Sequence, residues 1–173
     1  YFKSLDTPNK VYWLGELMGR SSLNVKNQDS RTLAIVRTKS HAHFVEAFAD
    51  AVDSEYSISQ METASNEQDR LQLSISNPTF IENLISAGYP GPDDDVAVFP
   101  DLEPPLRAAF LRGYLESCGY LSTGGWSIKV QSHEQTERFE EWIEGFGFKR
   151  VTSSSTPNNA SHVIRVSNVF DVR

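Results

Sequence analysis

The sequence predicts an α+β protein built from two similar halves. Helical and alternating segments follow one another in the same order twice, and a Pro/Gly/Asp-rich stretch separates the two copies. Corresponding features lie about 91 to 98 residues apart, as expected for a duplicated unit with varying loops. We therefore divide the chain into a first half (1–89), an acidic linker (90–103) and a second half (104–173). Each half is expected to read helix–strand–strand–helix–strand–strand–helix, with the first of its strands short.

The first half is predicted to open with a helix that begins at Pro8. Thr7 or Asp6 is suited to cap it, and proline is favoured at the first helical position. Its apolar stripe, at helical spacing, consists of Val11, Leu14, Gly15 and Met18. The further elements expected in this half are a strand over 32–39, a helix over 41–53 capped by Ser40, strands over 56–60 and 70–76, and a helix from Asn77 to near Gly88.

The second half repeats this order. Its first helix opens at Pro104, with Leu106, Ala109, Phe110 and Gly113 on one face. Ser132 and Gln135 have the spacing of a capping box before a helix over 134–147. Strands are expected over 126–131, 149–154 and 162–167. The pair Ser167–Asn168 repeats the helix cap at Ser76–Asn77, but only five residues follow. We therefore expect a truncated final helix and a chain that is part of a longer protein, in which either a further segment covers the second sheet or its exposed apolar surface binds a partner. The alternative is a shortened but complete domain.

The two opening helices are expected to pack against each other about a pseudo-two-fold axis. Gly15 and Gly113 lie at matching points on their apolar faces. Because glycine has no side chain, two helix backbones can approach closely at such positions. The alternative is that the two glycines carry no packing role.

Composition and charge limit the classes of function. The chain has 173 residues, 39% of them hydrophobic, and a net charge of −7. That charge argues against a simple nucleic-acid binder, although it leaves room for a basic face on an acidic body. A single cysteine excludes an internal disulfide and a cysteine zinc site. No apolar run is long enough to span a membrane. The location expected is intracellular, either cytoplasmic or nucleoid-associated.

Two segments carry a resemblance to a known family. The stretches VYWLGELMGRSSL (11–23) and FLRGYLESCGYLS (110–122) resemble the motif helices of the LAGLIDADG homing endonucleases. Residues 111–119 lie over the nine-residue signature without a gap, and 13–21 occupy the same window. The resemblance implies two pseudo-symmetric αββαββα halves, motif helices packed at the centre, and a saddle of two antiparallel four-stranded sheets over double-stranded DNA.

The chain departs from this family at the metal positions. The resemblance implies that the last acidic residue of each motif holds the metal ions, and these positions are Arg20 and Cys118. Mg²⁺ needs carboxylate oxygens, whereas arginine is a permanent cation and cysteine a soft ligand. Glu116 is the remaining weak catalytic candidate. We therefore expect a degenerate member with no metal site and no cofactor. Mg²⁺ would be required only if endonuclease activity survives.

Strand alternation predicts which side chains face DNA. Apolar residues pack inward, which leaves polar and basic residues outside, where Arg and Gln are suited to contact guanine and adenine edges. The register of the strand around 31–39 remains open. The DNA-binding candidates are the outward residues Arg70, Gln72, Lys129, Gln131 and Arg165, joined by Arg31, Arg37 and Lys39 at the ends of that strand and by Lys26 and Arg150. The alternative is an ordinary solvated sheet face.

Three functional hypotheses follow from these observations. The first is a catalytically inactive domain that binds double-stranded DNA. The second is a protein-interaction or architectural domain in a larger assembly, with its acidic surface facing partners. The third is a homing endonuclease with rearranged carboxylates.

Overall fold

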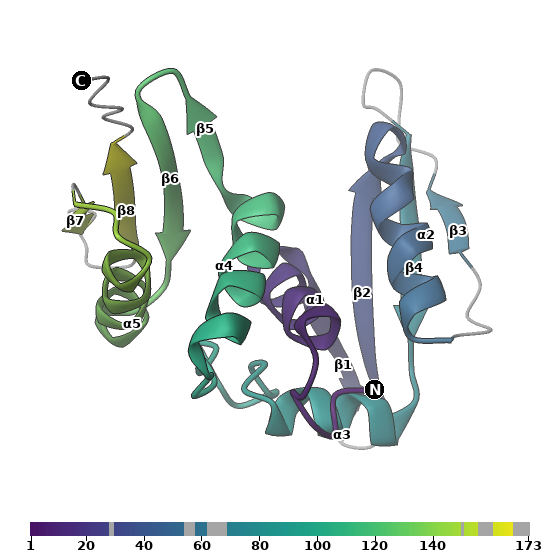
Figure 1. Cartoon of the computed structure of the whole chain (residues 1–173). Helices are drawn as coiled ribbons and strands as arrows, with labels where there is room; N and C mark the ends of the chain where they lie inside the picture. The colour runs from purple at the N-terminus through teal and green to yellow at the C-terminus, as the bar shows by residue number, and fades with distance from the viewer. Residues whose placement is uncertain (28–29, 54–57, 62–68, 150, 156–160, 168–173) are drawn as a thin grey trace.

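The computed structural model describes residues 1–27, 30–53, 58–61, 69–149, 151–155 and 161–167 (Figure 1). The first half contains α1 (Pro8–Arg20), β1 (Ser22–Asn27), β2 (Ser30–Thr38), a 3-10 turn (Lys39–His41), α2 (Ala42–Ala51), β3 (Ile58–Met61), β4 (Arg70–Ile75) and α3 (Pro78–Ser86). The second contains α4 (Pro104–Cys118), β5 (Tyr120–Ser122), β6 (Gly125–Val130), α5 (His133–Gly145), β7 (Val151–Ser155) and β8 (His162–Ser167).

The strands form two four-stranded antiparallel sheets. Their orders are β1-β2-β4-β3 and β5-β6-β8-β7, so the same connectivity occurs twice. Figure 1 shows α1 and α4 between the sheets, with α2 in front of the first sheet. This confirms the predicted α+β architecture. The helix predicted after Ser167 falls on residues 168–173, which lie outside the described residues.

Local side-chain hydrogen bonds set three of the helix starts, as predicted. Thr7 Oγ1 accepts from the backbone N–H of Lys10 at 3.4 Å, and Asn77 Oδ1 accepts from that of Phe80 at 3.0 Å. Ser132 Oγ accepts likewise at the start of α5, at 3.1 Å. Each bond satisfies an N–H group that the helix leaves without an intrahelical partner.

The predicted cap of α2 is wrong. Ser40 lies within the 3-10 turn, and α2 begins after His41 without a side-chain cap. The Ser40 hydroxyl instead lies 2.9 Å from Thr38 Oγ1. A local Ser–Thr contact in the turn thus replaces the cap.

The crossing of α1 and α4 is a backbone-to-backbone contact. A Cβ atom placed on Gly15 would overlap the carbonyl oxygen of Phe110, and one placed on Gly113 would overlap that of Tyr12. The two helices can approach this closely only because both positions lack a side chain. The predicted packing of the two glycine faces is therefore confirmed.

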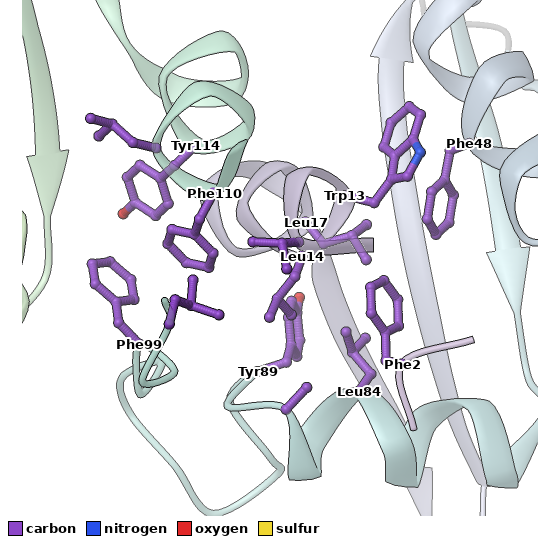
Figure 2. Close-up of a cluster of buried hydrophobic side chains, with 14 of the residues drawn as sticks. Phe2, Trp13, Leu14, Leu17, Phe48, Leu84, Tyr89, Phe99, Phe110 and Tyr114 are labelled. Atoms are coloured by element: carbon purple, nitrogen blue, oxygen red, sulfur yellow. The ribbon is translucent and has the colours of Figure 1, made fainter. Parts of the chain in front are cut away.

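Aromatic side chains fill the core on both sides of this helix pair (Figure 2). Trp13 contacts Phe48 of α2, with ring centroids 5.1 Å apart. On the other side Phe110 and Phe139 enclose Phe99, at centroid distances of 5.2 and 4.4 Å. Leu14 and Leu17 are fully buried. The central helices thus supply apolar surface to both halves.

The linker contributes to this core. Residues 90–103 contain no helix or strand, yet Ala97, Phe99 and Leu102 are buried. Gln135 Nε2 donates to the carbonyl oxygen of Ala97 at 2.7 Å, which anchors the segment to α5.

No helix in the described part of the chain is long and apolar enough to cross a lipid bilayer.

Candidate nucleic-acid interface and helix-end site

Each sheet has one face packed on helices and one face turned away from them. In β2 and β4 the inner residues Leu33, Ile35, Leu73 and Ile75 are buried. The residues that alternate with these inner residues belong to the outer face and are mostly small and polar, among them Thr32, Thr38, Gln72 and Ser74. The second sheet follows the same rule, with buried Ile128 and Ile164. Alternation therefore defines two polar outer faces, as predicted.

Charge is unevenly distributed between the strands and the rest of the chain. The protein contains 23 Asp and Glu residues, but none lies in the eight described strands. The Lys and Arg residues of these strands are Lys26, Arg31, Arg37, Arg70, Lys129 and Arg165. The helical side carries the opposite charge, since α5 alone has five glutamates. An acidic protein thus presents two sheets whose described strands contain no carboxylate.

Several of the predicted DNA contacts lie on the outer faces. Arg70, Lys129 and Arg165 are exposed there, and Gln131 is exposed directly after β6. Gln72 is half-buried, and its Nε2 donates to Ser74 Oγ at 2.7 Å. Arg165 Nη1 donates to Ser154 Oγ at 2.9 Å, which holds the guanidinium along the sheet surface.

Two candidates lie on the inner side of the first sheet. Arg31 and Arg37 alternate in phase with the buried Leu33 and Ile35, so both belong to the inner side of β2. Arg37 is 6% exposed and does not face outward. The sequence left this register open because basic residues flank the apolar run on both ends.

The remaining candidates are placed only in part. Lys39 is exposed in the 3-10 turn, and its Nζ lies 4.0 Å from Asp69 Oδ2. Lys26 belongs to β1, but its side chain lies outside the described part of the structure. Arg150 also lies outside the described residues.

The ends of α1 and α4 come together between the sheets. Arg20 is the last residue of α1 and Cys118 the last of α4, and each helix leads almost directly into a strand. A Cβ atom placed on Gly19 would lie 3.3 Å from Cys118 Sγ, so the two ends are adjacent. Arg20 is exposed. The Cys118 thiol donates to the Tyr114 carbonyl at 3.3 Å, and burial raises the pKa of this thiol.

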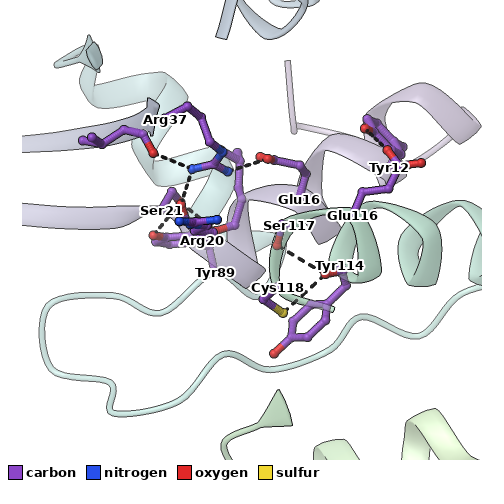
Figure 3. A network of polar contacts seen from close by, with 12 residues as sticks. Tyr12, Glu16, Arg20, Ser21, Arg37, Tyr89, Tyr114, Glu116, Ser117 and Cys118 are labelled. Atoms are coloured by element: carbon purple, nitrogen blue, oxygen red, sulfur yellow. Dashed lines mark hydrogen bonds and ion pairs between the residues drawn. The ribbon is translucent and has the colours of Figure 1, made fainter. Parts of the chain in front are cut away.

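A buried ion pair lies beside these ends (Figure 3). Glu16 is 3% exposed, and its carboxylate accepts from Arg37 Nη2. Arg37 Nη1 also donates to the carbonyl oxygens of Arg20 at 2.7 Å and Val36 at 2.9 Å. Burial raises the pKa of Glu16, and the charge of Arg37 opposes that shift. Arg37 therefore joins α1 to β2 rather than facing a ligand.

Glu116 is engaged elsewhere, on the side of Tyr12 (Figure 3). Its carboxylate accepts from the Tyr12 hydroxyl and from Arg112 Nε, both at 2.7 Å. Although partial burial raises the pKa of Glu116, these hydrogen bonds lower it below the ordinary value. The guanidinium of Arg112 also lies over the Tyr12 ring, 5.5 Å from its centroid.

These residues do not fit a magnesium ion. The two positions that the family resemblance assigns to the metal hold a guanidinium and a neutral thiol, neither of which is a ligand for a hard cation. The carboxylates of α1 and α4 are already engaged, because Glu16 is paired with Arg37, and Glu116 is held by Tyr12 and Arg112. Among the described residues, no three His, Cys, Asp or Glu side chains come together as a metal site.

One polar contact at this site was missed by the sequence analysis. Ser21, between α1 and β1, has its hydroxyl 2.9 Å from that of Tyr89 and donates to the Leu17 carbonyl at 2.7 Å. Because the serine has a single hydroxyl proton, Tyr89 is the donor between them. The only sequence signal was an aromatic residue after Gly88, where α3 has ended.

No protein-family model matches the chain, and no curated protein sequence matches it. Solved structures do match. Mesophilic variants of the homing endonuclease I-DmoI share 16% identity at a TM-score of 0.64, over 91% of this chain and 87% of that one. I-DmoI in complex with DNA and Ca matches at the same identity and TM-score, over 91% and 81%.

A second group of matches is of another kind. The N-terminal LAGLIDADG domain of DUF199/WhiA shares 13% identity at a TM-score of 0.61, over 97% of this chain and 79% of that one. Full-length DUF199/WhiA from Thermatoga maritima matches over 99% of this chain but 57% of its own length, with 13% identity and a TM-score of 0.63. At these identities the matches show a shared fold, and the chain has a LAGLIDADG-like fold.

Proposed function

We propose that this protein binds double-stranded DNA through the outer faces of its two sheets and does not cleave it. The observation that carries this proposal is the separation of charge, because the strands that the structure describes contain basic but no acidic residues in a chain of net charge −7. Phosphate contacts require local cations rather than a basic protein overall. Solved structures of I-DmoI, which shares the fold, include complexes with DNA.

The proposed lack of cleavage follows from the residues at the helix ends. Phosphodiester hydrolysis by a divalent metal requires carboxylates that hold the ion against the scissile phosphate. Arg20 adds positive charge where such an ion would be bound, and Arg37 already neutralises the buried Glu16. Glu116 would have to give up two hydrogen bonds before it could bind a metal.

The salt dependence of binding tests the interface. We would measure the affinity for a labelled duplex by fluorescence anisotropy at several NaCl concentrations. Replacement of Arg70, Lys129 and Arg165 by alanine should weaken binding and reduce the log–log salt slope by about 0.9 for each lost phosphate contact. The matched control replaces Lys3, Lys10 and Arg107, which lie around the start of α1 and in the first turn of α4. It removes the same charge and should leave the slope unchanged.

Other outcomes would favour the alternative hypotheses. Equal effects of the two triple variants would mean that binding depends on net charge alone. An absence of DNA binding even at low salt would favour a protein-interaction domain. Mg²⁺-dependent cleavage that disappears in Glu116→Gln would favour an endonuclease with rearranged carboxylates.

We also propose an intracellular location, because that is where duplex DNA is found. In WhiA a similar fold forms the N-terminal domain of a longer protein. We propose that this chain is likewise one domain of a longer protein. Within the chain we propose a first half at residues 1–89, a linker at 90–103 and a second half at 104–173. The size of the native gene product on an immunoblot would test the modular arrangement.

A further inference from the structure

We call the boundary between the two sheets, where α1 leads into β1 and α4 leads into β5, the seam. It contains an exposed arginine, Arg20. Arg20 ends α1, Ser21 follows, and β1 begins at Ser22. In Figure 1, α1 lies between the sheets and continues directly into β1. Cys118 lies in the equivalent place at the end of α4, shortly before β5. A duplex lying across both outer faces would pass over this seam.

We propose that Arg20 binds a DNA backbone phosphate directly at this seam, without a metal ion. The proposal rests on the DNA binding proposed above and adds a site that is separate from the outer faces of the sheets. A guanidinium is suited to this task because it is always charged and presents several N–H donors to phosphate oxygens.

The carboxylates near this charge already have other partners, although the charge of Arg20 also acts on Glu16. Glu16, one turn before Arg20, is 3% exposed and already paired with Arg37. Cys118 is a neutral thiol at ordinary pH, because burial raises its pKa. Glu116 is engaged with Tyr12 and Arg112. Among these described neighbours, both carboxylates therefore have an arginine partner other than Arg20, which limits their repulsion of a phosphate at the seam.

The end of α1 is also prepared electrostatically. The last carbonyl groups of a helix lack intrahelical partners and carry the negative end of its dipole, which disfavours a phosphate. Here Arg37 Nη1 donates to the Arg20 carbonyl at 2.7 Å, and the backbone and hydroxyl of Ser21 both donate to Leu17 O, at 3.0 and 2.7 Å. These contacts offset the negative end beneath the Arg20 side chain.

The test compares single-charge variants in EDTA with the same labelled duplex. Arg20→Gln should weaken binding about tenfold and reduce the salt slope by about 0.9, the contribution of one phosphate contact. Arg20→Lys should keep the slope, since it keeps the charge. Lys10→Gln, at the opposite end of the same helix, removes one charge and should change neither quantity. Thermal unfolding of each variant checks that the fold is retained.

Three results would overturn the proposal. If Arg20→Gln binds like the wild type while the outer-face triple variant is weakened, the sheets bind DNA but the seam does not. If the wild type binds only after Mg²⁺ is restored, a metal rather than the guanidinium contacts the phosphate. If the wild type binds no duplex at all, the proposed function fails together with this site.

Discussion

The close crossing of α1 and α4 predicts that Gly113→Ala lowers the stability of the protein, although alanine favours the helix itself. Alanine is preferred over glycine within a helix by about 1 kcal/mol. At position 113 its Cβ would overlap the carbonyl oxygen of Tyr12 and lie 3.0 Å from the backbone nitrogen of Glu16. Backbone atoms cannot rotate away, so the helices must separate, and overpacking of this kind costs about 1 to 3 kcal/mol or more. Because separation also loosens the contacts along both helices, we expect a net loss of about 2 kcal/mol.

Gly145→Ala supplies a matched control. Gly145 ends α5, and a Cβ placed there would meet no atom within 4 Å. This change should be neutral or stabilise the protein by about 0.5 kcal/mol. Thermal unfolding followed by circular dichroism should show Gly113→Ala about 4 to 8 °C below the wild type. If both variants shift in the same direction, the backbone contact at the crossing does not limit helix approach.

Three further predictions concern the polar residues around the helix ends. Glu16→Gln leaves the buried Arg37 charge unpaired and should lower the free energy of unfolding, measured in urea, by about 3 kcal/mol. Replacing both Glu16 and Arg37 by methionine should lower it less, because no unpaired charge is left buried. The pKa of Glu116 is lowered in the folded state, so its stabilising effect is present above the unfolded pKa and is lost as pH falls through the folded pKa. The stability difference between wild type and Glu116→Gln should therefore shrink from about pH 7 to about pH 3. The double variant Arg20→Asp, Cys118→Asp should bind Ca²⁺ with a heat detectable by titration calorimetry. If Ca²⁺ produces no heat of binding with this variant, more than two ligands are missing.

Much of the fold could be predicted because local chemistry and packing agree. Thr7, Asn77 and Ser132 each cap the helix that follows, and the apolar residues of the alternating strands pack inward as predicted, Leu73 and Ile75 among them. The matched positions of Gly15 and Gly113 predicted the crossing of the central helices. These signals depend on residues close in sequence or on a repeat, so they do not require knowledge of the tertiary structure.

The features that were missed depend on contacts between distant segments. Arg37 looked like a surface cation because it ends an apolar strand, but Glu16, 21 residues earlier, supplies the partner that allows its burial. Phe99 lies in a Pro/Gly/Asp-rich linker, and its burial follows only from the space left between α4 and α5. Ser40 was predicted to cap α2 but lies within the 3-10 turn that follows β2.

The most direct test of DNA binding without cleavage follows both properties in one sample. The wild-type protein would be titrated onto a labelled duplex in EDTA at several NaCl concentrations, then supplied with excess Mg²⁺ or Mn²⁺, and the DNA would be recovered on a denaturing gel. We expect binding that weakens linearly on a log–log plot as salt rises, with the recovered strands intact. An absence of salt-dependent binding, or strands cut after the metal is added, would contradict the account.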